Sequence, residues 1–151
     1  MKKKVSRKRP SRKKNLGKFK SALEKYCSDR LRESGIAFAY EQHTYELMPK
    51  FRYPHRYLKM TPKSKTMADR TGSMQHPIKY TPDFVAKDGS WVIETKGYVH
   101  DRHDFPMRWK LFLKYLIDND INCSVYIAKN RQQVDEVIRD ILEGGEQRAV
   151  A

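Results

Sequence analysis

Apolar residues recur at helical spacing in three segments of the chain. In the first, positions three or four apart form one apolar face, which predicts a helix over 18–34 that ends near Gly35. The second segment, 102–117, has Pro106 in its first turn, where proline is tolerated. The third begins at Asn130, a residue suited to an N-cap, and stops at Gly144. The pattern therefore predicts three amphipathic helices.

Four other segments have the patterns of strands. Ile36, Phe38 and Tyr40 alternate and predict a strand over 36–46. Segments 80–86 and 91–96 read as two short strands, joined by a Lys-Asp-Gly-Ser sequence typical of a hairpin turn. Segment 121–128 has few charges and predicts a buried strand. The order of elements predicts an α/β domain over 18–145, with a mixed β-sheet flanked by helices.

Residues 47–79 interrupt this order with a different composition. The segment holds four prolines, three aromatic residues and eight basic residues, among them Lys50, Arg52, Arg56, Lys59, Lys63, Lys65 and Arg70. This composition predicts a long loop or a hairpin insertion. A loop of this length in a compact domain is usually functional or mobile. Basic and aromatic side chains suit contacts to a nucleic-acid backbone and stacking on unpaired bases. A flexible, solvated loop explains the composition equally well.

Charge is concentrated at the N-terminus. The net charge is +14, and residues 1–20 contain 11 Lys or Arg and no acid, so the rest of the chain carries 14 − 11 = +3. Such a block repels itself and binds phosphate-rich partners. We expect residues 1–17 to form a basic, disordered arm that binds nucleic acid, and 146–151 to form a C-terminal tail. The alternatives for the arm are a solubility or targeting segment, or a segment that binds an anionic membrane surface.

Other features narrow the class of protein. No apolar run approaches the roughly 18 residues of a membrane span, and no apolar stretch follows the basic N-terminus as in a secretory signal. Cys27 and Cys123 are far apart and form no Cys-x-x-Cys motif, which argues against a disulfide framework or a zinc ribbon. We therefore expect a cytoplasmic protein without membrane partners.

The segment YTPDFVAKDGSWVIETKG, residues 80–97, contains the candidate chemistry. Folding at the hairpin turn brings Asp83 beside Glu94, and two carboxylates at neighbouring strand positions suit a hard cation such as Mg²⁺. The backbone carbonyl of Thr95 could add a ligand. Glu94 and Lys96 are two apart in a strand and share a face. An ordinary turn cap and surface ion pair would explain the same residues, but charges directly after a buried run need partners.

TPDF followed by IETKG resembles the signature of the PD-(D/E)xK nuclease superfamily, whose triad would be Asp83, Glu94 and Lys96. FKSALEKY and ESGIAFAYE are similar to the start of the phage endonuclease I family of Holliday-junction resolvases. The resemblance implies a restriction-endonuclease-like fold and Mg²⁺-dependent hydrolysis of branched DNA by a homodimer, with Mn²⁺ as a substitute. It also implies the host cytoplasm if the chain is phage-encoded. The 47–79 insertion is longer than in that family, where the region bridges two intertwined subunits, so exchange of segments stays open.

The same resemblance assigns a role to Glu24. In that family the glutamate of the first helix completes the metal site, and Glu24 is the matching residue. Ser21 and Glu24 also match the Ser-x-x-Glu capping box, in which the glutamate only closes the helix terminus. We favour the catalytic role, so the expected catalytic set is Glu24, Asp83, Glu94 and Lys96, and the expected metal ligands are Glu24, Asp83, Glu94 and Thr95.

Basic residues near these motifs are the expected DNA contacts: Lys13, Lys14, Lys18, Lys20, Arg52, Arg56, Arg102 and Arg108. Arg108 and Lys110 could equally form the solvated side of the second helix. His100 and His103 are not part of the compact His and Cys set that zinc needs, so we expect surface or DNA-facing histidines, and a role near the site stays open. Two other functions fit the chain: a nicking or restriction-like endonuclease on duplex DNA, and a nucleic-acid-binding protein without catalysis.

Overall fold

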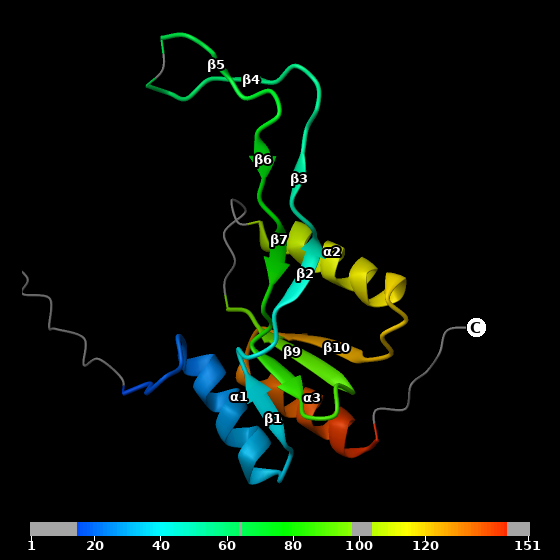
Figure 1. Cartoon of the computed structure of the whole chain (residues 1–151). Coiled ribbons are helices and arrows are strands. Elements are labelled where there is room, and N and C mark those ends of the chain that lie inside the picture. Colours follow the sequence, from blue (N-terminus) through cyan, green and yellow to red (C-terminus); the bar gives the residue numbers. More distant parts are fainter. Residues whose placement is uncertain (1–14, 64, 98–103, 145–151) are drawn as a thin grey trace, which may run out of the picture.

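A mixed sheet and three helices form the body of the computed structural model, which describes residues 15–63, 65–97 and 104–144 (Figure 1). The strand order is β1-β8-β9-β10, with β1 at Phe38–Tyr40, β8 at Phe84–Ala86, β9 at Trp91–Thr95 and β10 at Ser124–Ala128. The pairs β1–β8 and β8–β9 are antiparallel, whereas β9 and β10 are parallel. The predicted α/β class with a mixed sheet is therefore confirmed.

Helices cover both faces of this sheet. Helices α1 (Ala22–Glu33) and α3 (Arg131–Leu142) pack on the face that contains Phe84 and Ile93. Helix α2 (Phe105–Asp118) connects β9 to β10 and packs on the opposite face, against Val85 and Val92. Because successive strand residues point to opposite faces, a sheet covered on both sides has continuous apolar strands, and all five residues of β9 are buried.

The three predicted helices are present, with shorter bounds. Helix α1 begins four residues later than predicted, and the Asn130 side chain caps α3 by accepting from the Gln133 N–H at 2.9 Å. In the described part of the chain, no helix is long and apolar enough to cross a membrane.

Two predicted strands are each divided in the structure. The strand predicted over 36–46 is wrong as one element, because the chain turns at Glu41, whose φ is 47°, and continues as β2 (Tyr45–Met48) in a different sheet. The strand predicted over 80–86 is likewise divided into β7 (Ile78–Tyr80) and β8. Both breaks lie where the chain leaves the body and returns to it, so they mark the ends of the insertion.

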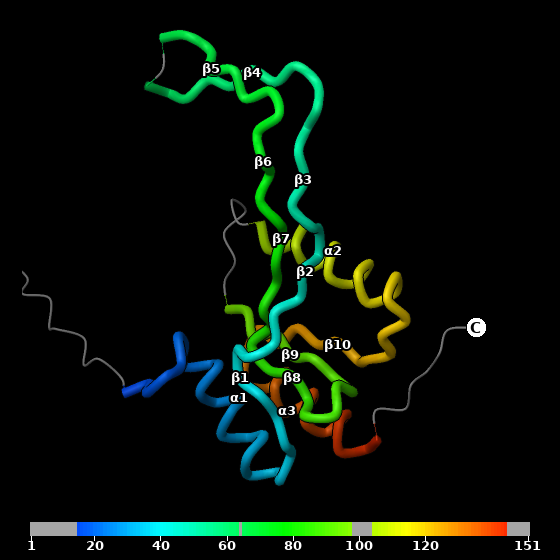
Figure 2. The backbone as a smooth tube through the Cα atoms, in the orientation of Figure 1, coloured from blue at the N-terminus to red at the C-terminus, as the bar shows by residue number. Residues whose placement is uncertain are grey.

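The insertion is an antiparallel ribbon that extends away from the body (Figure 2). Strand β2 pairs with β7, β3 (Phe51–Arg52) with β6 (Met74–Gln75), and β4 (Leu58–Lys59) with β5 (Ala68–Asp69). Of the two alternatives predicted for residues 47–79, the hairpin insertion is therefore correct and the long loop is wrong. At the base, the Tyr45 ring packs 5.0 Å from Phe112 and 5.8 Å from Tyr115, which anchors the ribbon on α2.

Candidate active site

The β8–β9 hairpin brings the two central carboxylates together. Phe84 pairs with Ile93 in the antiparallel register, so the next positions outward are Asp83 and Glu94. At the other end the turn closes on Gly89, whose φ of 77° favours glycine. Asp83 and Glu94 are 8% and 3% exposed, so two like charges lie buried at one end of the two central strands. The adjacency predicted from the sequence is confirmed.

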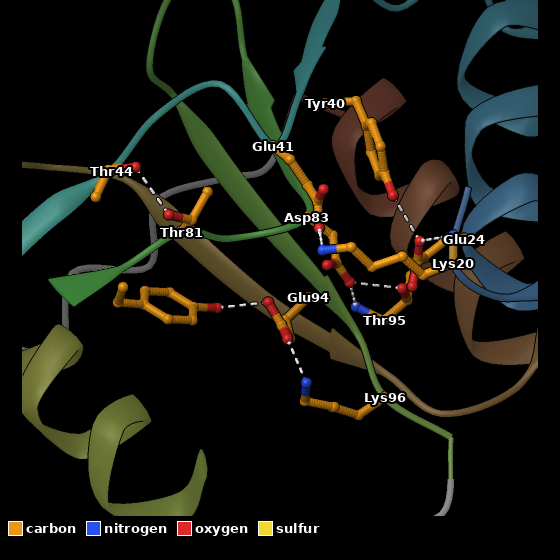
Figure 3. Close-up of polar contacts among 11 residues, drawn as sticks. Lys20, Glu24, Tyr40, Glu41, Thr44, Thr81, Asp83, Glu94, Thr95 and Lys96 are labelled. Carbon is orange, nitrogen blue, oxygen red and sulfur yellow. Dashed lines mark hydrogen bonds and ion pairs between the residues drawn. The ribbon is translucent and has the colours of Figure 1, made fainter. Parts of the chain in front are cut away.

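Asp83 is held by the residue that follows Glu94. Its Oδ2 atom accepts from the Thr95 N–H at 2.8 Å and from the Thr95 hydroxyl at 2.6 Å (Figure 3). Burial, and next the negative charge of Glu94, raise the pKa of Asp83 to about 6, although the Thr95 hydrogen bonds lower it. Thr95 is therefore a donor that orients Asp83, and its carbonyl as a metal ligand stays a prediction.

Glu94 lies between a tyrosine and a lysine. Its Oε2 atom accepts from the Tyr80 hydroxyl at 2.6 Å, and its Oε1 atom lies 2.9 Å from the Lys96 Nζ atom. The Lys96 ammonium also lies 4.5 Å from the centroid of the Phe105 ring, at the start of α2. Burial and the charge of Glu94 raise the pKa of Tyr80 well above its ordinary value, so this phenol remains a donor. Glu94 and Lys96 share a face, as predicted.

Glu24 does more than close its helix. The Ser21 hydroxyl caps α1 by accepting from the Glu24 N–H at 3.1 Å. The Glu24 carboxylate, however, accepts from the Lys20 N–H at 2.9 Å and the Tyr40 hydroxyl at 2.6 Å, rather than from the Ser21 N–H. The backbone cap is therefore present, while the carboxylate, only 7% exposed, is oriented by a residue of β1.

All four predicted catalytic side chains line one pocket of about 500 Å³: Glu24, Asp83, Glu94 and Lys96. Within the described residues, Oδ1 of Asp83 and Oε1 of Glu24 accept no hydrogen bond. The only fully buried side-chain polar atom without a partner there is Ser28 Oγ, so these two carboxylate oxygens are open to the pocket. Each of the three carboxylates thus has one oxygen fixed by a neighbouring donor. Asp83 and Glu24 keep their second oxygen available to a ligand in the pocket.

The predicted DNA contacts fall in three places. Lys20 and Arg108 line the pocket, where Lys20 pairs with Glu41, and Arg108 pairs with Asp104 and donates to the Lys79 carbonyl at 2.6 Å. Lys18 is exposed just before α1, and Arg52 and Arg56 are exposed on the ribbon. Lys13, Lys14, Arg102, His100 and His103 lie outside the described residues, as does most of the predicted arm.

Sequence reasoning missed the two tyrosines that orient the carboxylates. Tyr80 lies 14 positions from Glu94, and Tyr40 lies 16 positions from Glu24. Tyr80 is the residue directly before the TPD motif, and Tyr40 belongs to the AYE segment, so both were inside the motifs already singled out. A buried phenol beside a carboxylate motif is the signal that could have identified them, because a buried hydroxyl needs a partner.

Comparison of the chain with family models, with curated proteins and with solved structures gives no match.

Proposed function

We propose that the chain is a metal-dependent endodeoxyribonuclease of the PD-(D/E)xK type, with a restriction-endonuclease-like fold. One observation carries the proposal: Glu24, Asp83, Glu94 and Lys96 come from three separate segments and line the same pocket. Buried carboxylates that share a site repel one another, and a bound cation removes that repulsion. The resemblance of TPDF and IETKG to the superfamily signature supports the same assignment.

The donor set fits Mg²⁺ better than a metal that needs a complete protein cage. Among the residues described, no three His, Cys, Asp or Glu side chains form a ready ligand set. Mg²⁺ usually keeps several waters and is bound through one or two carboxylates plus substrate phosphates. Asp83 and Glu94 would supply these two carboxylates, and the open oxygen of Glu24 would hold a coordinated water or a second ion. Mn²⁺ would substitute at such an oxygen-rich site.

Each side chain has a distinct task in this proposal. The metal would polarise the phosphate and lower the pKa of a bound water. Lys96 would orient that water or neutralise charge on the phosphate, and Glu94 and the Phe105 ring hold its ammonium in position. Tyr80 and Thr95 fix the carboxylates, as partners of metal ligands commonly do.

We propose branched DNA as the substrate and a homodimer as the active species, acting in the cytoplasm. Resolution of a four-way junction needs two symmetric cuts, and one pocket hydrolyses one strand, so two copies at fixed geometry are required. The resemblance of residues 19–41 to the junction-resolving family supports this choice. A nicking or restriction-like endonuclease on ordinary duplex, and a binding protein without catalysis, are the alternatives that the experiment must separate.

The test compares a four-way junction with linear duplex of the same sequence, with Mg²⁺ and with EDTA. We expect Mg²⁺-dependent cleavage that favours the junction, and sedimentation should give the mass of a dimer. Asp83→Asn, Glu94→Gln and Lys96→Ala should each reduce the rate by orders of magnitude. Asp118→Asn, an exposed carboxylate at the far end of α2, is the matched control and should cut normally.

Three results would contradict parts of this proposal. Normal Mg²⁺-dependent cleavage by Asp83→Asn would remove the metal assignment. DNA binding without cleavage of either substrate would leave the non-catalytic binding protein. A monomer that cuts both DNAs equally would leave a general or nicking nuclease.

A further inference from the structure

The outer part of the ribbon, residues 49–76, forms a largely exposed ribbon arm. From 49 to 71, every described residue is exposed except Tyr57, which is half-buried. Two short ladders hold the arm together, and a hydrogen bond of 2.7 Å from the Arg70 N–H to the Tyr57 carbonyl supports the bend between them. A two-stranded hairpin alone in water is marginally stable, so a partner that covers the arm would stabilise it.

The charge of the ribbon arm is strongly positive. It contains seven basic residues and one acid: Lys50, Arg52, Arg56, Lys59, Lys63, Lys65, Arg70 and Asp69. The acid is engaged in a turn, because the Asp69 carboxylate accepts from the Thr71 N–H at 2.9 Å. In the described part of the chain none of the seven cations forms an ion pair, so their charge is free for an anionic partner.

Large apolar side chains are exposed between these cations. The exposed set on the ribbon arm is Phe51, Tyr53, Leu58, Met60, Met67 and Met74. Cations interleaved with aromatic and apolar groups match a partner that offers both phosphates and base or sugar surfaces. A second copy of the arm is a poor match, because the two surfaces would oppose like charges.

The ribbon begins and ends at the candidate active site. Glu41 and Thr81, at the two ends of the ribbon, both line the pocket, and the Thr44 and Thr81 hydroxyls lie 2.8 Å apart between its two legs. Tyr80, the last residue of β7, donates to Glu94. A polymer held at the carboxylates therefore passes the base of the ribbon.

We propose that the ribbon arm binds duplex DNA on one side of the bond cut in the pocket. The major groove of DNA admits a two-stranded ribbon, and the cations of the arm then lie beside phosphates. From Tyr45 to Leu58 this leg of the ribbon spans at most about 43 Å at 3.3 Å per residue. At 3.4 Å per base pair this length corresponds to about a dozen base pairs. The choice of DNA rests on the proposed function, whereas the arm's geometry and charge do not.

The test measures binding in EDTA, so that metal-dependent cleavage does not occur. Lys50→Gln, Arg56→Gln and Lys59→Gln are combined in one variant, which leaves Arg52 in place because it donates to the Gly72 carbonyl. Anisotropy with labelled duplexes of increasing length gives affinity against salt. The matched control combines Arg32→Gln, Lys87→Gln and Arg139→Gln, which are exposed cations at the opposite end of the body. Thermal melting verifies that both variants fold.

For the arm variant we expect the slope of log affinity against log salt to fall by about 2.7, because each lost phosphate contact removes about 0.9. Its affinity should also stop rising at a duplex length shorter by about a dozen base pairs. An unchanged slope, or an equal fall in the control, would overturn the proposal. A changed sedimentation mass with an unchanged slope would overturn it too and identify the arm as a contact between copies. Cleavage is a separate readout. If the wild type binds through the arm but never cuts, the proposed nuclease function is contradicted, whereas the proposed DNA contact of the arm is supported.

Discussion

Replacement of Asp83 by Asn should stabilise the protein at neutral pH when no divalent cation is present. The pKa of Asp83 is about 6 against an ordinary value of 3.8, because burial and Glu94 disfavour its ionised form. A carboxyl with a raised pKa binds its proton more tightly in the folded state, so stability falls as pH rises from about 3.8 to about 6. The difference of 6 − 3.8 = 2.2 corresponds to at most about 3 kcal/mol at 1.36 kcal/mol per unit. Asn removes this cost and can still accept from the Thr95 N–H.

The assay is chemical unfolding in EDTA at several pH values. At pH 7.5 the Asp83→Asn variant should have the higher free energy of unfolding, by up to about 3 kcal/mol or roughly 9 °C in Tm. Below pH 6 the gap should shrink, to less than about 1 kcal/mol at pH 4, where the folded-state carboxyl is already protonated and the unfolded-state carboxyl is about half protonated. A variant less stable than wild type at pH 7.5, or a gap that does not change with pH, would refute the reasoning. Mg²⁺ should stabilise wild type by about 2.7 kcal/mol at 100 times its Kd and leave Asp83→Asn unaffected.

Three further predictions concern the groups around these carboxylates. Tyr80→Phe removes the donor to Glu94 and should lower cleavage or Mg²⁺ affinity by about 10–100-fold, measured by Mg²⁺ titration of the rate. Ser21→Ala should cost about 0.5–2 kcal/mol of stability with little loss of cleavage. Glu24→Gln should lose cleavage at nearly constant Tm. A Glu24→Gln variant with a lower Tm and intact cleavage would restrict Glu24 to a capping role. Deletion of residues 1–15 removes nine Lys or Arg and should reduce the salt dependence of DNA affinity while the rate at saturating DNA is maintained.

Local patterns were enough to predict the hairpin and the side chains that it brings together. The turn at Gly89 and the spacing of Asp83, Glu94 and Lys96 fix which residues face one another, because antiparallel pairing follows from the turn. The Asn130 cap was predictable for the same reason, since a cap depends on residues within one turn of helix. These features involve neighbours in the sequence or one tight reversal of the chain.

The rest depends on contacts that no local pattern specifies. The strand predicted over 36–46 was divided because Glu41 adopts a left-handed conformation, and its N–H donates to the Asp83 carbonyl at 2.9 Å. The composition of 47–79 indicated a loop or a hairpin, whereas the pairing of β2 with β7 joins residues 30 or more positions apart, next to the contact between Thr44 and Thr81. The tyrosine partners of Glu24 and Glu94 come from other elements, so the sequence offers the phenols as candidates and the folded chain shows which carboxylate each one holds.

Tyr80 links the ribbon, the core and the pocket. Its ring packs 4.8 Å from Phe112 in the cluster beneath α2, and its hydroxyl fixes one oxygen of Glu94. Because the ring is only 5% exposed, the ribbon cannot shift at its base without disturbing either this packing or the carboxylate. Under the proposed function, the same aromatic anchor that fixes the direction of the ribbon arm also orients a metal ligand. A DNA held by the arm would then meet the carboxylates in a defined register, without contacts to the bases at the pocket.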